Sequence, residues 1–206
     1  MFWDKVSGVY DLFGNIYNGK VNREMCRIVS AEIRPEDDVL ECACGTGMIS
    51  VYAAAKCHHL IATDYAEGML RKTRKKLINM TNTEVRKADI THLEFADESF
   101  DIVIAGNVIH LLDEPQTALK ELDRVCRKGG KLIIPTYVNK DDTGKESTFS
   151  KTVGKAGADF KRQFTFGNYR SFFTDAGYTD IVVHEIRGRV PCAVAVIRKT
   201  EYIHAG

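Results

Sequence analysis

A short apolar run, a glycine-containing turn and a second apolar segment, in that order, limit most strongly how this chain can fold. Residues 39–41 form the run, residues 42–47 form the turn, and residues 48–55 have the pattern of a helix. Strand, glycine turn and helix together open a nucleotide-binding βαβ unit. Because glycine lacks a Cβ, Gly45 and Gly47 permit a tight turn and let a ligand lie against the backbone. The sequence therefore predicts an α/β sheet with a ligand site at this turn.

The next predicted strand supports a nucleoside as the ligand. It covers residues 59–63 and ends at Asp64, which follows Glu41 by 23 positions. An acid at about this spacing binds ribose hydroxyls and disfavours a 2′-phosphate. The third glycine of the dinucleotide-binding fingerprint is missing, because Ser50 stands in its place. The glycine pattern alone is therefore weak evidence, and Asp64 strengthens it.

Further strands and helices alternate along the rest of the chain. We expect strands at 83–88, 102–106, 131–137, 181–187 and 192–198, and helices at 65–80, 115–127 and 167–176. Pro115 near the start of its helix and Gly129-Gly130 just after its end are the usual boundary residues. The last two strands are joined by only four residues, 188–191, which is too short for a parallel crossover. This closing pair must therefore be antiparallel.

Polar side chains follow the third and fourth predicted strands. Asp89-Ile90 comes after one strand, and Asn107 and His110 come after the next. Open α/β sheets bind ligands at the carboxyl ends of their strands. Asp89 could bind an adenine amino group or serve as a turn or cap residue. His110 could orient a substrate, accept its proton, or be a structural histidine.

Length and composition indicate one globular domain, residues 1–206. Residues 2–33 look helical in two pieces, and we expect residues 1–33 to form a lid over the ligand turn. The segment 138–164 is polar and lacks clear periodicity, so we expect it to shape a substrate pocket. The net charge of +1 gives no drive toward nucleic acid, and the basic run at 71–76 fits a solvated helix face.

Targeting and metal signals are weak in this sequence. No apolar stretch reaches the roughly 20 residues that span a bilayer, and the first residues do not resemble a signal peptide, so a cytoplasmic location is expected. The six cysteines match no common zinc spacing, and we expect no metal site.

Over nearly its whole length the chain resembles the class I S-adenosylmethionine-dependent methyltransferases. The residues that carry the resemblance are the turn motif 39–47, Asp64-Tyr65, Asp89-Ile90, the segment 99–107 and the segment 127–132. Within this family it is similar to the ubiquinone and menaquinone biosynthesis enzymes and other small-molecule methyltransferases. The resemblance implies a Rossmann-like, seven-stranded, mostly parallel sheet with a C-terminal antiparallel hairpin and helices on both faces.

The resemblance also implies S-adenosylmethionine as cofactor, S-adenosylhomocysteine as product, and roles for individual residues. Glu41 and the backbone of residues 43–47 would hold the methionine portion, and Asp64 would hold the ribose. Tyr65 and Met69 would lie beside adenine, and Asp89 would bind its amino group. Asn107 would line the methyl-transfer crevice, Tyr10 would contact the cofactor from a lid, and His110 would act as a base or orient the substrate. The remaining expected contacts around the cofactor are Cys42, Ala43, Gly45, Gly47, Ile90 and Val108.

Three other interpretations remain open at this point. An NAD-dependent oxidoreductase shares the glycine turn and Asp64, but the missing third glycine and the antiparallel closing pair count against it. A cofactor-binding protein without catalytic activity would keep the same residues. The cysteines could indicate arsenite or thiol chemistry, although no pair of them is clearly placed at the substrate side. The acceptor, which we expect to be a small molecule, and the oligomeric state are not identified.

Overall fold

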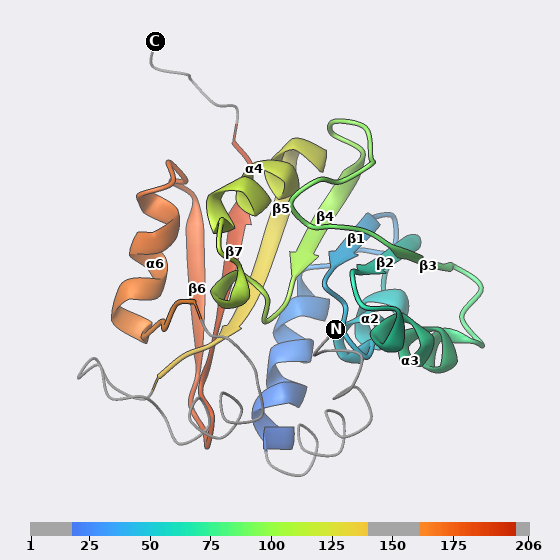
Figure 1. Ribbon diagram of the computed structural model, residues 1–206, viewed down its shortest axis with the longest axis horizontal. Helices are drawn as coiled ribbons and strands as arrows, with labels where there is room; N and C mark the ends of the chain where they lie inside the picture. Colours follow the sequence, from blue (N-terminus) through green and yellow to red (C-terminus); the bar gives the residue numbers. More distant parts are fainter. Residues whose placement is uncertain (1–17, 140–160, 201–206) are drawn as a thin grey trace.

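Residues 18–139 and 161–200 are described by the computed structural model, and they form one sheet with helices on both faces (Figure 1). A helix of residues 18–31 comes before the first strand. The elements that follow are β1 (Asp38–Cys42), α2 (Met48–Ala54), β2 (His59–Asp64), α3 (Glu67–Leu77), β3 (Thr83–Lys87), β4 (Phe100–Ala105), the short 3₁₀ helix η1 (Ile109–Leu111), α4 (Pro115–Val125), β5 (Cys126–Tyr137), α6 (Phe166–Thr174), β6 (Ile181–Ile186) and β7 (Cys192–Arg198).

The seven strands lie in the order β3-β2-β1-β4-β5-β7-β6. The pairs from β3 to β5 are parallel, whereas β7 runs antiparallel to both β5 and β6. This arrangement confirms the predicted mostly parallel sheet and the antiparallel C-terminal hairpin. The strand order reverses between β1 and β4, and ligands of open α/β sheets bind at such a switch point.

Apolar side chains alternate between two cores, one on each face of the sheet. Along β1, Val39 belongs to the core that contains residues of the helix 18–31, α2 and α3, whereas Leu40 belongs to the core that contains residues of α4 and α6. Strands buried on both faces need continuous apolar runs, which is why the central strands could be recognised in the sequence. Each face is covered by helices, as predicted.

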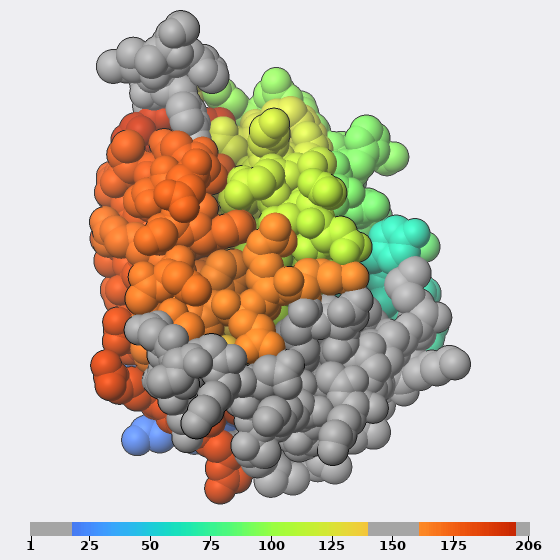
Figure 2. Space-filling model, turned by 60° about the vertical axis from the view of Figure 1, so that its left-hand side comes forward, coloured from blue at the N-terminus to red at the C-terminus, as the bar shows by residue number. Residues whose placement is uncertain are grey.

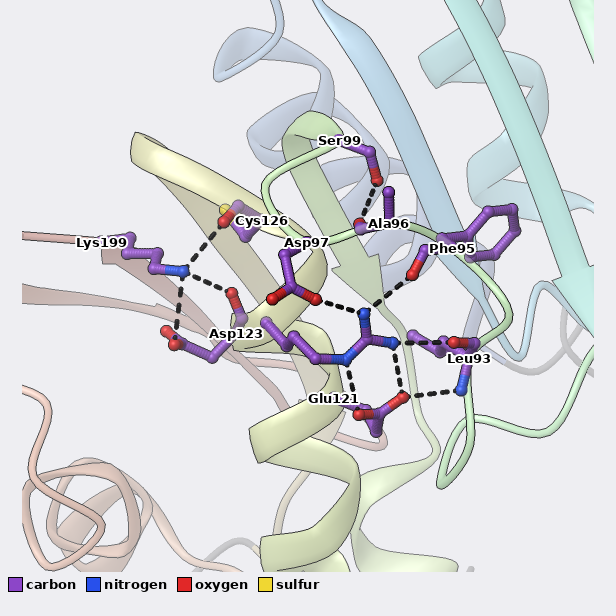
Figure 3. Close-up of polar contacts among 10 residues, drawn as sticks. Leu93, Phe95, Ala96, Asp97, Ser99, Glu121, Asp123, Cys126 and Lys199 are labelled. Carbon is purple, nitrogen blue, oxygen red and sulfur yellow. Dashed lines mark hydrogen bonds and ion pairs between the residues drawn. The ribbon is translucent and has the colours of Figure 1, made fainter.

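The end of α4 differs from the prediction. We expected the helix to end at residue 127 before Gly129-Gly130, but α4 ends at Val125 and β5 begins at once with Cys126. Both glycines lie within β5, and Gly129 has a φ of 74°. The last turn of α4 is capped from a distance: the ammonium group of Lys199 donates to the carbonyl oxygens of Asp123 (2.7 Å) and Cys126 (2.9 Å) (Figure 3). A lysine at the helix C-terminus replaces the glycine cap that the sequence suggested.

A second cluster in Figure 3 fixes the segment between β3 and β4 against α4. The guanidinium of Arg124 donates to the carbonyl oxygens of Leu93 (2.7 Å) and Phe95 (2.8 Å) and pairs with the carboxylates of Glu121 and Asp97. One arginine thus satisfies backbone oxygens and carboxylates together, a geometry that its planar fork of donors allows. The segment it anchors follows directly after Asp89 and Ile90, so this cluster helps to position one wall of the ligand site.

The first and the last helix of the described chain pack on opposite faces of the sheet. The helix of residues 18–31 buries Val21, Met25 and Val29 against the sheet, and Ile28 is partly buried beside them. On the other face the surface of α6 adjoins that of α4 (orange and yellow-green in Figure 2), and Tyr169 and Phe173 are buried there.

Residues 1–17, 140–160 and 201–206 lie outside the described part of the chain. The N-terminal lid and most of the inserted segment 138–164 therefore stay predictions, as does the single-domain assignment. None of the helices within the described ranges is long and apolar enough to cross a bilayer. The cytoplasmic location also stays a prediction.

Candidate functional site

A cavity of about 360 Å³ lies where the carboxyl ends of β1, β2 and β4 meet. The described residues that line it come from the glycine turn, from the segments after β2, β3 and β4, and from α2 and α3: Glu41, Ala43, Cys44, Gly45, Thr46, Met48, Ile49, Asp64, Tyr65, Ala66, Met69, Ala88, Asp89, Ile90, Gly106, Asn107, Val108, Leu111 and Leu112. Its size is within the range usual for small-molecule sites. The sheet therefore has a cavity at the switch point where the sequence predicts a ligand.

The turn after β1 has the backbone that its glycines suggest. Gly45 and Gly47 have φ values of 57° and 80°, and Ala43 has a φ of 53° in the same left-handed region. A Cβ on Gly47 would lie 3.2 Å from the Cα of Thr73 in α3, so the turn and α3 approach more closely than a side chain would allow. The hydroxyl of Thr73 donates to the carbonyl oxygen of Gly45 at 2.9 Å, which ties the turn to α3.

Asp64 connects the turn to the end of β2. Its carboxylate accepts the backbone N–H of Gly45 and that of Ala66, both at 2.8 Å, and its side chain is half-buried at the cavity wall. These two bonds hold the turn against the end of β2. Asp64 thus has a structural role in the turn, and its ribose role stays a prediction.

Glu41 lies at the floor of the cavity and is almost completely buried, with 1% of its surface exposed. One of its carboxyl oxygens, Oε2, accepts the hydroxyl of Ser50 from α2 at 2.5 Å. The pKa of Glu41 is raised to about 8, mainly by burial and in smaller part by the nearby Asp64, while the hydrogen bond from Ser50 acts in the opposite direction. The carboxyl is therefore mostly protonated at neutral pH in the free protein.

The end of β4 supplies the third side of the cavity. Asn107 has a φ of 55°, its N–H donates to the carbonyl oxygen of Pro135 at 2.7 Å, and its side-chain oxygen accepts the N–H of Tyr137 at 3.0 Å. These bonds fix the chain after β4 against β5. A Cβ on Gly106 would lie 2.6 Å from Cδ1 of Ile49, so a larger residue there would require the end of the Ile49 side chain to shift. Asn107 and Val108 both line the cavity, as predicted for a crevice at the strand ends.

The residues that are predicted to lie beside adenine line the cavity from the ends of β2 and β3 and from α3. These four residues are Tyr65, Met69, Asp89 and Ile90. Met69 and Ile90 are buried, whereas Tyr65 is half-exposed. Nζ of Lys87 lies 4.9 Å from the centroid of the Tyr65 ring. Oδ1 of Asp89 accepts both the N–H and the hydroxyl of Thr91, so the turn role considered for this acid is present.

Three predicted residues of the described chain, Cys42, Gly47 and His110, are not among those that line the cavity. Cys42 is fully buried in β1 and belongs to the core. Gly47 lies at the end of the turn, against Thr73 of α3. His110 is buried in η1, where its carbonyl oxygen accepts the N–H groups of Lys161 and Arg162, and burial lowers its pKa to about 4. A fourth, Tyr10, lies outside the described residues, and the functional roles of all four stay predictions.

Sequence reasoning missed several residues that contribute to the cavity. Gly106 could have been found from its place at the end of an apolar strand. Other missed residues that line the cavity are Met48, Ile49, Leu111 and Leu112. Only the packing of α2 and η1 brings these side chains together. Among the residues that the structure describes, no cluster of three or more His, Cys, Asp or Glu side chains could hold a metal ion.

The sheet order, the reversed seventh strand and the cavity beside the glycine turn define a class I methyltransferase fold. A solved structure from Thermotoga maritima, described as an S-adenosylmethionine-dependent methyltransferase and possible histamine N-methyltransferase, superposes with a TM-score of 0.77 at 22% identity, over 97% of this chain and 99% of that one. At this identity the likeness shows the fold alone.

Sequence comparisons agree with the fold. Residues 40–134 match the model of the family described as "Methyltransferase domain". The demethylmenaquinone methyltransferase of Clavibacter sepedonicus is 34% identical over 135 residues, which are 64% of this chain and 55% of that protein. The phosphatidylethanolamine N-methyltransferase of Cereibacter sphaeroides is 33% identical over 130 residues, which are 60% of this chain and 62% of that protein.

The chain is similar in sequence and in fold to the class I S-adenosylmethionine-dependent methyltransferases, and its residues 40–134 match the methyltransferase-domain family. Its similarity to the ubiquinone and menaquinone biosynthesis group is also confirmed. The chain spans between about half and two thirds of the length of most of the curated relatives it matches, and 31% of one of them.

Proposed function

We propose that this protein uses S-adenosylmethionine to methylate a small-molecule acceptor. The observation that carries the proposal is the cavity at the ends of β1, β2 and β4, which places the carboxyl groups of Glu41 and Asp64 beside a glycine turn within the region that matches the methyltransferase family.

The residues of the cavity fit the chemical groups of this cofactor. Gly45 lines the cavity and presents backbone without a side chain to a ligand. The buried carboxyl of Glu41 suits the amine of the methionine portion, and the carboxylate of Asp64 suits the ribose hydroxyls. Tyr65, Met69 and Ile90 offer apolar surface for a purine ring.

When bound, the cofactor supplies an electrophilic methyl group on a sulfonium. The protein therefore has to hold the cofactor, align the acceptor atom with the methyl group and exclude water. Asn107 and Val108 lie at the crevice where this alignment would take place. His110 has a pKa far below neutral, so it is neutral at pH 7 and is better suited to orient an acceptor than to take up its proton.

Two alternative functions make different predictions. An NAD-dependent oxidoreductase is disfavoured by the antiparallel β7 and by Ser50 at the third glycine position. A protein that binds S-adenosylmethionine without catalysis would show the same cavity.

Calorimetric titration with S-adenosylmethionine, S-adenosylhomocysteine and NAD tests the cofactor. We expect micromolar binding of the two adenosyl ligands and loss of that binding in Asp64→Ala. The matched variant Asp64→Asn keeps the shape and one acceptor oxygen, so it should retain more affinity. Binding of NAD alone would contradict the proposal.

Release of S-adenosylhomocysteine in the presence of acceptors tests turnover. The relatives are named for chemically different acceptors, a demethylmenaquinone and phosphatidylethanolamine. The acceptor panel should therefore contain reduced quinones, amine-bearing lipids and small soluble amines. Tight cofactor binding without turnover of any of these would favour the non-catalytic alternative.

A further inference from the structure

Ser50 is a buried hydroxyl that the proposed function does not yet use. It lies in α2, is fully buried, and is not among the residues that line the cavity. Its hydroxyl nevertheless donates to Oε2 of Glu41, which does line the cavity. Any effect of Ser50 on a ligand therefore has to pass through Glu41.

The surroundings of Glu41 disfavour its ionised form. Asp64 at the end of β2 repels a negative charge on Glu41. Three thiols also interact with Glu41: Cys26 in the helix of residues 18–31, Cys42 in β1 and Cys44 in the glycine turn. Burial raises the pKa of each of these thiols far above neutral, so they carry no charge at pH 7. Against burial and Asp64, the hydrogen bond from Ser50 favours the carboxylate.

We propose that Ser50 is a positioning residue of the cofactor site: its hydroxyl orients the buried carboxyl group of Glu41 and helps it to ionise when a ligand amine binds. This inference rests on the proposed function, because it takes the methionine amine as the group that Glu41 receives.

The chemistry of the pair explains why a hydroxyl is needed. A protonated carboxyl binds an ammonium group poorly, whereas a buried carboxylate needs donors to replace its lost water. Ser50 satisfies Oε2, and within residues 18–139 and 161–200 no hydrogen bond to Oε1 is seen, so an amine can approach that oxygen. Amine binding then ionises Glu41 and releases its proton, so the affinity rises with pH and levels off above about pH 8.

Two ligands that differ in the amine test the proposal. S-adenosylhomocysteine carries the amino acid portion, whereas 5′-methylthioadenosine has the same nucleoside thioether without it. We expect the affinity for S-adenosylhomocysteine to rise between pH 6 and pH 8 with proton release, as measured by calorimetry in buffers of different ionisation enthalpy. The affinity for 5′-methylthioadenosine should not change with pH over this range.

Ser50→Ala should weaken S-adenosylhomocysteine binding at pH 7 by about tenfold, the equivalent of a pKa rise of about one unit in Glu41. Its affinity should recover only at higher pH, while the affinity for 5′-methylthioadenosine stays at the wild-type value. Ser50→Thr keeps the hydroxyl and should restore the wild-type profile. If Ser50→Ala does not fold, Ser50→Cys keeps the size with a weaker donor and should show a smaller shift in the same direction.

Thr63→Val provides a matched control. The hydroxyl of Thr63 is also buried and also donates to Glu41, but to its backbone oxygen at 3.1 Å. Its removal should leave the pH profile of S-adenosylhomocysteine binding unchanged.

The outcomes separate the two proposals. A pH profile that is the same in Ser50→Ala and wild type would overturn the role of Ser50 and leave the proposed function intact. Equal loss of both ligands in Ser50→Ala would also overturn it, since that result indicates a merely structural role. Failure of the wild-type protein to bind S-adenosylhomocysteine would refute the proposed function and this inference together.

Discussion

Glu41 makes the stability of the protein depend on pH in an unusual direction. Its pKa is about 8 in the folded protein, against 4.5 for an ordinary glutamate. Between these pH values the folded state keeps a proton that the unfolded chain gives up, so the free energy of unfolding falls as the pH rises. This destabilisation is absent well below pH 4.5 and is complete above pH 8.

Replacing Glu41 by glutamine removes the ionisation with little change in shape. One pKa unit corresponds to about 1.4 kcal/mol. At pH 5 Glu41 is not fully ionised in the unfolded chain, and at pH 8 it is not fully ionised in the folded protein. The range from pH 5 to pH 8 therefore shows only part of the full pKa difference. Over that range the wild type should lose about 3 to 4 kcal/mol of unfolding free energy relative to Glu41→Gln. The variant should therefore resemble the wild type at pH 5 and be clearly more stable at pH 8.

Urea unfolding followed by circular dichroism, at pH 5, 6, 7 and 8, measures this difference directly. The other titrating groups are shared by the two proteins and cancel in the comparison. Two stability curves that run parallel over this pH range would show that Glu41 ionises normally in the folded protein. That result would refute the argument from burial.

Two further predictions concern the glycine turn and the thiols. Gly47→Ala and Gly129→Ala both place a Cβ at a left-handed φ, of 80° and 74°, and each should lower the free energy of unfolding by about 1 to 2 kcal/mol. A Cβ on Gly47 meets Thr73, whereas nothing lies within 4 Å of a Cβ on Gly129. Only Gly47→Ala should therefore also reduce S-adenosylhomocysteine binding, by at least about tenfold. Equal losses of binding in the two variants, measured by calorimetry, would contradict this. All six cysteines are buried, and burial raises the pKa of each one. A disulfide reagent at pH 8 should therefore react with none of them in the folded protein and with six after denaturation. Rapid reaction of a cysteine pair in the folded protein would instead support the hypothesis of arsenite or thiol chemistry.

The sequence by itself determined the layout of the sheet and the place of its ligand site. Parallel strands that are buried on both faces need continuous apolar runs, and these runs are visible without any structure. The four-residue connection before Cys192 leaves no room for a crossover, which made the antiparallel hairpin predictable. The residues that close the strands, such as Asp64 and Asn107, therefore had to lie at one edge of the sheet.

Contacts between distant residues could be decided only by the tertiary structure. The end of α4 was mispredicted because its capping lysine, Lys199, follows Cys126 by 73 positions. The sequence left open whether His110 contacts a substrate or is a structural histidine; the structure buries it in η1, with its carbonyl oxygen bound by the N–H groups of Lys161 and Arg162. The hydrogen bond from Ser50 to Glu41 depends on how α2 packs on β1. Local patterns encode burial and turns, whereas the ionisation state of a buried carboxyl depends on every group that packing brings around it.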